Sequence, residues 1–237
     1  MCWSPSISLF FSIIYVLFIK YYCFVKPKYW KQYILFSGFY LVMELFQTFQ
    51  WVFGDVGICN NTNRLFTVVA YILIWLQPIL FSVIGLMSKS NRLVFLKLLV
   101  INVIVFCYAM TTLTLGTVQK SQFYQIAHSI YSNDTCTTIG RTNHLVWQFK
   151  VSTIDHQPNH LLYLILSATS FIFYRSWRLK SIGLGWIASL IMTIQILDPD
   201  TLEMASTWCL FSVSANLVIL SMMFVKIIQR KLKKINS

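Results

Sequence analysis

Residues 41–51, LVMELFQTFQW, place a carboxylate and two amides inside a run of bulky apolar side chains. The polar members are Glu44, Gln47 and Gln50. In a helix, side chains three or four positions apart lie on one face, so this segment has one polar stripe. The stripe runs through Ser37, Tyr40, Glu44, Thr48 and Trp51, with Gln47 at its edge. The meaning of Glu44 depends on whether the segment crosses a membrane.

The composition of the chain indicates an integral membrane protein. Of its 237 residues, 57% are hydrophobic and only 11% are charged, whereas a soluble domain carries about 25% charged residues. Most of the surface must therefore face something other than water, and the expected partner is the lipid bilayer. The net charge of +12 would suggest nucleic acid in a soluble domain, but the basic residues lie in short loops between apolar runs. This pattern is typical of membrane orientation, so no nucleic-acid partner is expected.

The predicted fold class is an all-α polytopic transmembrane helix bundle of about seven spans, forming a single unit over residues 1–237. About 20 helical residues cross a hydrocarbon core of about 30 Å. Two of the apolar segments, 158–176 and 181–197, are short and would form either full spans or a re-entrant hairpin. The predicted segments are 5–25, 33–53, 65–87, 93–115, 158–176, 181–197 and 205–225.

The charges predict the orientation of the bundle. Most of the Lys and Arg residues fall on one side, in the groups 20–31, 89–97, 175–180 and 226–234. Every acidic residue except Glu44 falls on the other side. The positive-inside rule then places the N-terminus outside and the C-terminus in the cytoplasm. The basic tail, 226–237, is expected to lie along anionic lipids of the cytoplasmic leaflet, although ordinary orientation charge explains it equally well.

Residues 116–157 form the one long polar connection, on the outer or lumenal side. Cys136 in this loop and Cys59 before the third segment would pair in an oxidising compartment, the alternative being two free thiols. The triplets NNT and NDT make Asn60 and Asn133 glycosylation acceptors, Asn133 being the better one because it is far from the membrane. These features suit a membrane of the secretory pathway, the host or a virus.

Glu44 is expected near the middle of the bilayer. A charge there costs at least about 2.5–3.5 kcal/mol, so the side chain should face inward and be protonated or hydrogen-bonded to amides. Pro78 frees the carbonyl group of Ile74, which a side chain or water must satisfy. The polar residues would either join helices or form a site where Glu44 binds a cation, a proton or a polar ligand. The candidate residues are Glu44, Gln47, Gln77, Asn102 and Asn216.

The four histidines give a weak indication of a metal site. His156 and His160 have the spacing of helical metal ligands, but Pro158 between them argues against one helix holding both. Solvated or interfacial histidines are the better interpretation, so no metal or other cofactor is expected. The sequence contains no catalytic motif, and an enzyme is the less favoured class.

Three short motifs carry a family resemblance: MELFQ, CNNTNRLFT and AYILIWLQP, within residues 43–80. They resemble an uncharacterised group of small multi-pass membrane proteins from giant DNA viruses and algae. The resemblance implies no activity. It implies a signature made of Glu44, Gln47, Cys59, Asn60, Asn63, Gln77 and Pro78.

Three functions are consistent with this sequence. The first is a transporter-like or receptor-like bundle that binds a small polar ligand or a proton near Glu44. The second is a structural or assembly protein of a membrane compartment. The third is a membrane enzyme that uses the outer loop with its histidines.

Overall fold

A computed structural model describes residues 4–88, 91–114, 131–132, 134–140, 143–150, 158, 160–196, 217 and 221. Within these residues the chain forms six helices and three short strands. The helices are α1 (Pro5–Val25), α2 (Trp30–Phe53), α3 (Asn61–Met87), α4 (Arg92–Thr114), α6 (His160–Phe173) and α7 (Trp177–Ile196). Six predicted segments coincide with these helices to within a few residues; of the seventh, 205–225, the structure describes only residues 217 and 221.

Local sequence signals explain where two of the helices begin. The hydroxyl of Ser4 accepts a hydrogen bond from the Ile7 amide at 3.2 Å, and Pro5 occupies the first turn of α1, where no amide donor is required. Asn60 caps α3 in the same way, because its side-chain oxygen accepts from the Asn63 amide at 2.9 Å. These caps satisfy amides that have no partner inside the helix.

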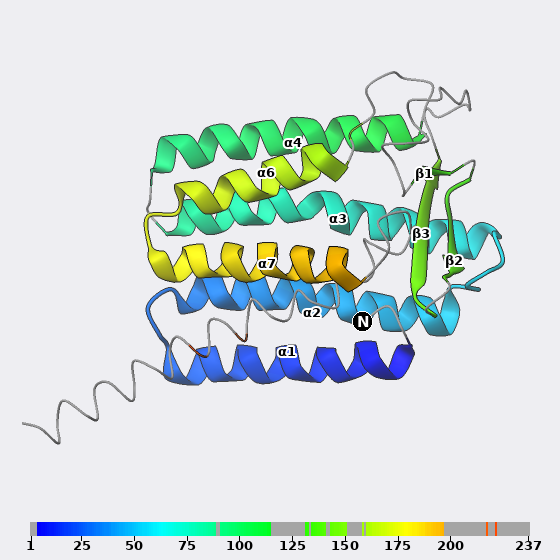
Figure 1. The fold of residues 1–237 in the computed structure, drawn as a ribbon, viewed down its shortest axis with the longest axis horizontal. Helices are drawn as coiled ribbons and strands as arrows, with labels where there is room; N and C mark the ends of the chain where they lie inside the picture. Colours follow the sequence, from blue (N-terminus) through cyan, green and yellow to red (C-terminus); the bar gives the residue numbers. More distant parts are fainter. Residues whose placement is uncertain are drawn as a thin grey trace, which may run out of the picture.

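The helices lie side by side and alternate in direction, with α3 at the centre of the bundle (Figure 1). The α1–α2, α3–α4 and α6–α7 connections are all at one end. We call this the basic end, because the described side chains near it include nine cations and no acidic residue. They are Lys20, Lys26, Lys28, Lys31, Arg92, Lys97, Arg175, Arg178 and Lys180.

The opposite end, here called the sheet end, carries the α2–α3 connection and three strands (Figure 1). The strands are β1 (Tyr131–Ser132), β2 (Cys136–Ile139) and β3 (Leu145–Lys150), in the order β1-β3-β2. β3 is parallel to β1 and antiparallel to β2, with Thr137 opposite Trp147. The fold is therefore mostly helical and not all-α, because part of the connection predicted at 116–157 forms strands. The alternating and β-branched residues of this loop pair as a small sheet.

Three of the described helices are long and apolar enough to cross a membrane: α1, α3 and the Arg92–Leu113 part of α4. Leu161–Phe173 of α6 is apolar but shorter. On α1 and α4 the outer faces expose Phe10, Leu17, Val100 and Ile104, side chains that suit lipid better than water. α2 differs from these helices because its inward face is polar.

An aromatic layer fills the half of the bundle nearer the basic end. Tyr15 of α1 stacks on Tyr40 of α2 with ring centroids 6.2 Å apart, and Tyr22 and Tyr33 pair one layer further along at 5.2 Å. Phe36 lies 4.8 Å from Tyr40, centroid to centroid, and 6.4 Å from Phe81 of α3. We use the name aromatic layer for Tyr15, Tyr22, Tyr33, Phe36, Tyr40 and Phe81.

Candidate functional site

The polar residues of α2 face the interior of the bundle. Glu44, Gln47 and Gln50 follow each other at three-residue spacing, and all three are fully buried. The buried face is rotated slightly from the predicted stripe: Gln47 is near its centre, whereas Thr48 and Trp51 are half-buried at its edge. Glu44 thus points into the bundle, as the sequence predicts.

At the sheet end, the hydroxyl of Thr137 on β2 joins α2 to α3. It accepts a hydrogen bond from the Gln50 side-chain amide at 2.8 Å and shares another with the Thr67 hydroxyl at 2.7 Å. The indole N–H of Trp147 donates to the Gln50 side-chain oxygen at 3.0 Å. Both ends of the Gln50 amide are thus satisfied, and the sheet is attached to two helices through buried bonds.

Asn63 of α3 pairs with the backbone of β2 as a neighbouring strand would. Its side-chain oxygen accepts from the Thr137 amide at 2.7 Å, and its side-chain nitrogen donates to the Thr137 carbonyl at 2.8 Å. The Gly57 amide donates to the same carbonyl at 3.1 Å. These contacts cover the outer edge of β2, which would otherwise expose unpaired backbone groups.

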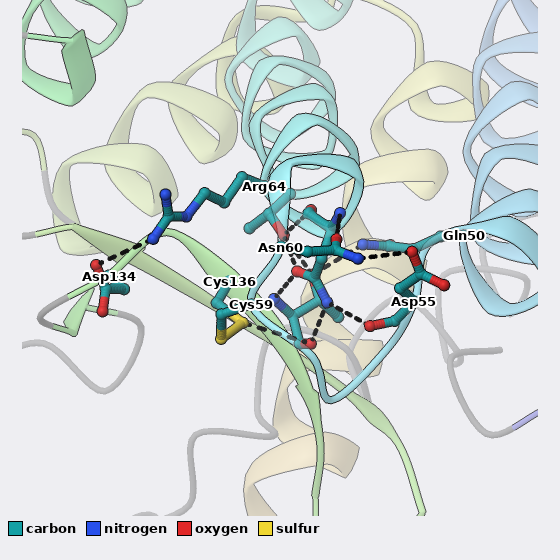
Figure 2. Close-up of a disulfide and its surroundings, with 10 residues drawn as sticks. Gln50, Asp55, Cys59, Asn60, Arg64, Asp134 and Cys136 are labelled. Carbon is teal, nitrogen blue, oxygen red and sulfur yellow. Dashed lines mark hydrogen bonds and ion pairs between the residues drawn. A yellow bond between two sulfur atoms is a disulfide. The ribbon is translucent and has the colours of Figure 1, made fainter.

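A disulfide between Cys59 and Cys136 fixes this contact, as the sequence predicts (Figure 2). It links the α2–α3 connection to β2 across 77 residues of sequence, with the two Cα atoms 5.4 Å apart. Arg64 and Asp134 form an exposed ion pair nearby, at 3.9 Å, which adds little stability in water.

The two predicted glycosylation acceptors differ in what the structure says of them. The side chain of Asn60 caps α3 and also donates to the Asp55 carboxylate at 2.7 Å (Figure 2), so an attached sugar would compete with this contact. Asn133 lies outside the described residues. Glycosylation of either residue stays a prediction.

On the other side of Glu44, the amide of Gln77 joins three helices. Its oxygen accepts from the Tyr40 hydroxyl of α2 at 3.1 Å and from the Tyr163 hydroxyl of α6 at 2.7 Å. Its nitrogen lies 3.4 Å from the Met43 sulfur. Gln77 is therefore committed to helix contacts and does not reach Glu44.

Asn102 of α4 is also committed to helix packing. Its side-chain nitrogen donates to the Pro78 carbonyl at 2.9 Å and to the Ser82 hydroxyl at 2.8 Å. The carbonyl of Pro78 itself thus bonds to α4. The side-chain nitrogen of Asn102 contacts α3 and not Glu44, and Asn216 lies outside the described residues.

Between these two satisfied regions lies a set of polar groups without partners. In the described part of the chain, no hydrogen bond reaches either carboxyl oxygen of Glu44, either polar atom of the Gln47 amide, or the indole nitrogen of Trp51. The three residues follow one another at spacings of three and four along α2, and we call them the unpaired stripe. An unsatisfied buried polar group costs about 1–3 kcal/mol, so three neighbouring ones indicate an incomplete site.

Helix α1 brings small hydroxyl side chains to the depth of the unpaired stripe. Because Tyr15 lies opposite Tyr40 and Tyr22 opposite Tyr33, the antiparallel register places Ser12 at the depth of Glu44 and Ser8 at that of Gln47. Both serines are buried, and the Ser12 hydroxyl donates to the Ser8 carbonyl at 2.9 Å. The surroundings of the stripe are therefore partly polar on two helices.

The histidines do not converge in the residues that the structure describes. His144 is buried just before β3, His160 begins α6, and His128 and His156 lie outside the described part. Among the described residues, no group of three His, Cys, Asp or Glu side chains could hold a metal ion.

Sequence reasoning missed Thr67, Thr137 and Trp147, which complete the network around Gln50. The pattern CTTI followed by LVWQF, rich in β-branched and aromatic residues, could have indicated the two strands. Nothing in the sequence pairs these strands with residues 50–67.

A sequence profile described as a family of unknown function (DUF5765) matches residues 10–232. An uncharacterised protein of Acanthamoeba polyphaga mimivirus is 49% identical over 230 residues, which cover 93% of this chain and 95% of that protein. No solved structure matches the chain. The viral relative agrees with the resemblance to proteins of giant DNA viruses.

Proposed function

We propose that this chain, which belongs to the family of unknown function DUF5765, is a multi-pass membrane protein whose bundle binds a proton or a small polar ligand at Glu44 and Gln47. The observation that carries the proposal is the unpaired stripe, in which buried polar groups one turn apart have no protein partner among the described residues. Buried polar groups in proteins are otherwise hydrogen-bonded.

The distribution of charge supports the membrane orientation in this proposal. The basic end has nine described cations, whereas the described carboxylates Asp55 and Asp134 belong to the sheet end. A disulfide at the sheet end suits an oxidising compartment. We therefore place the sheet end outside and the basic end in the cytoplasm.

The chemistry of the stripe restricts what it can bind. A neutral carboxyl both donates and accepts hydrogen bonds, as the Gln47 amide does, whereas a carboxylate would need a cation as its partner. The described residues supply no Lys, Arg or His near Glu44 along α2 or α3. The site therefore suits a proton, or a small ligand that donates hydrogen bonds.

The test compares wild type with Glu44→Gln, which keeps the size of the side chain and removes its acid group. The midpoint of thermal unfolding of the purified chain is measured at rising pH and with ammonium, amino acids and sugars. At low pH both folded and unfolded chains hold the proton. As pH rises the unfolded chain releases it first, because a charge at Glu44 is costly in the folded bundle, so the stability of wild type should fall relative to that of the variant.

The matched control is Asp134→Asn, which removes an exposed carboxylate at the sheet end. It should keep the wild-type response to pH and to each compound. If wild type and Glu44→Gln unfold alike at every pH and with every compound, the proposed site does not exist.

A structural or assembly role is the second candidate, and the satisfied networks favour it. Gln77, Asn102 and Thr137 each bond to a neighbouring element, as residues that only fix helix packing do. In that case Glu44→Gln would change overall stability or the capture of partner proteins, with no loss of a pH or ligand response.

A further inference from the structure

The unpaired stripe leads from Glu44 in one direction only. Toward the sheet end, Gln47 and Trp51 continue it for about 10 Å along α2, at about 1.5 Å per residue. Gln50 lies beside this path and is fully bonded to Thr137 and Trp147. Unsatisfied hydrogen-bonding groups in a row, one helical turn apart, are groups that bridging waters can connect.

Toward the basic end, the path from Glu44 is closed by the aromatic layer. One turn along α2, Tyr40 stacks on Tyr15 and packs against Phe36. The Tyr40 hydroxyl donates to Gln77, which also holds the Tyr163 hydroxyl. Rings in contact across α1, α2 and α3 exclude water from the space between these three helices.

Among the described side chains around Glu44 there is no permanent counter-charge, which leaves a proton as its simplest counterpart. Within about a turn of its depth, the titratable side chains are Tyr15 on α1, Tyr40 on α2 and Tyr71 on α3, which are neutral at physiological pH. The nearest described charges along α2 are Asp55 and Lys31, about 16 and 20 Å away. Neither supplies a permanent counter-charge.

We propose that Glu44 takes up a proton from the sheet side alone, through waters held by Gln47 and Trp51, and that the aromatic layer stops the proton there. The carboxylate accepts a proton from water to form its O–H, and returns it to water when the outside becomes alkaline. The bundle then senses the pH of one compartment and does not conduct protons. This inference rests on the proposed function, because it names the proton as the species bound.

The experiment uses the full chain in vesicles, with a tag at the C-terminus selecting each orientation. The infrared carbonyl band of protonated Glu44 is identified by its absence in Glu44→Gln. The pH is then stepped on one side while the other side is buffered. We expect the band to follow the pH at the sheet end only, and a dye in the vesicle lumen to report no proton flux above that of protein-free vesicles.

Variants of the stripe test the route. Gln47→Leu and Trp51→Phe should each slow the response of the band about tenfold, as a barrier raised by about 1.4 kcal/mol implies. The matched control is Thr48→Val. The Thr48 hydroxyl donates to the backbone carbonyl of Glu44 and lies outside the unpaired stripe, so this variant should respond like wild type.

Two results would overturn one-sided proton uptake but not the proposed binding site: a band that follows the pH at the basic end, and a proton flux that Glu44→Gln abolishes. A third such result is the absence of the band in a protein whose unfolding still responds to a ligand. If the band is missing and the unfolding of Glu44→Gln matches that of wild type throughout, the proposed function fails as well. The sidedness itself is measured on the wild type, and Glu44→Gln serves only to assign the band.

Discussion

Thr137 connects β2 to both α2 and α3. Its side chain bonds to Gln50 of α2 and Thr67 of α3, and its backbone pairs with Asn63. Its neighbour Cys136 holds the disulfide. The hydrogen bonds of Thr137 are all buried. Removing the Thr137 hydroxyl would therefore leave Gln50 and Thr67 with unsatisfied polar groups that water does not reach.

The first prediction concerns the hydroxyl of Thr137. Thr137→Val keeps the shape of the side chain and removes the bonds to Gln50 and Thr67, so the free energy of unfolding should fall by about 1–3 kcal/mol. Thr137→Ser should recover most of the loss. Thr138→Val makes the same change at the neighbouring, half-buried position and should have little effect; equal losses for Thr137→Val and Thr138→Val would contradict the assignment.

At this scale, the sequence predicts what depends on a single residue and its immediate setting. The inward orientation of Glu44 follows from the cost of a charge in lipid, and the pairing of Cys59 with Cys136 from their shared side. The partners that Gln77 and Asn102 have in the structure, Tyr40 and Tyr163 for the first and Pro78 and Ser82 for the second, could not be predicted. Depth along a helix can be read from the sequence, but rotation toward one neighbour or another is set by tertiary packing.

At the scale of elements, the contact between α3 and α4 depends on a glycine. A Cβ atom placed on Gly85 would lie 2.1 Å from the ring of Phe95, which is fully buried at the start of α4. Helix axes approach closely where one of them has no side chain, so a small residue sets this crossing.

The second prediction therefore compares two glycines inside helices. Gly85→Ala should lower the free energy of unfolding by about 1–3 kcal/mol, because Phe95 must move out of a filled space. Gly38→Ala, where a Cβ meets nothing within 4 Å, should raise it by up to about 1 kcal/mol through helix propensity. Unfolding of the two variants by denaturant measures both effects, and a stabilised Gly85→Ala protein would show that the α3–α4 contact is looser than described.

Helices were easier to predict than strands, for a physical reason. A helix such as α3 has 27 residues of apolar sequence with a cap at its start, so its pattern is averaged over many turns. The strands have two, four and six residues, and β2 and β3 are stable through their contacts with each other and with Asn63. Such tertiary contacts leave no periodic signal in the sequence.

The third prediction concerns the attachment of the sheet. Replacing both Cys59 and Cys136 by Ala removes a link that closes a long loop, and should cost about 2–5 kcal/mol in the free energy of unfolding. Limited proteolysis should then cut β2 and β3 faster and leave the helices intact. Removing the exposed free thiols, Cys23 and Cys107, is the control and should leave the rate unchanged. Equal cleavage rates in all the variants would mean that Asn63 and Thr137 alone hold the sheet.

At the scale of the whole molecule, the arrangement follows from the separation of charge between the two ends. Composition and charge predict a helical membrane protein with its basic loops on one side, and the described basic loops do share one end (Figure 1). The α6–α7 connection, with Arg175, is at this end too. The number of spans and the choice between two crossings and a re-entrant hairpin remain predictions; of the segment at 205–225 the structure describes only residues 217 and 221.

Labelling with a membrane-impermeant maleimide tests most directly whether the two ends of the bundle lie on opposite sides of a membrane. Two single-cysteine reporters are used in a background that keeps the Cys59–Cys136 disulfide: the native Cys23, exposed near the basic end, and Ile139→Cys, at a half-exposed position at the end of β2. In intact cells the reagent should label Ile139→Cys at once and Cys23 only after the membrane is opened. Labelling of both reporters from the same side would contradict the account.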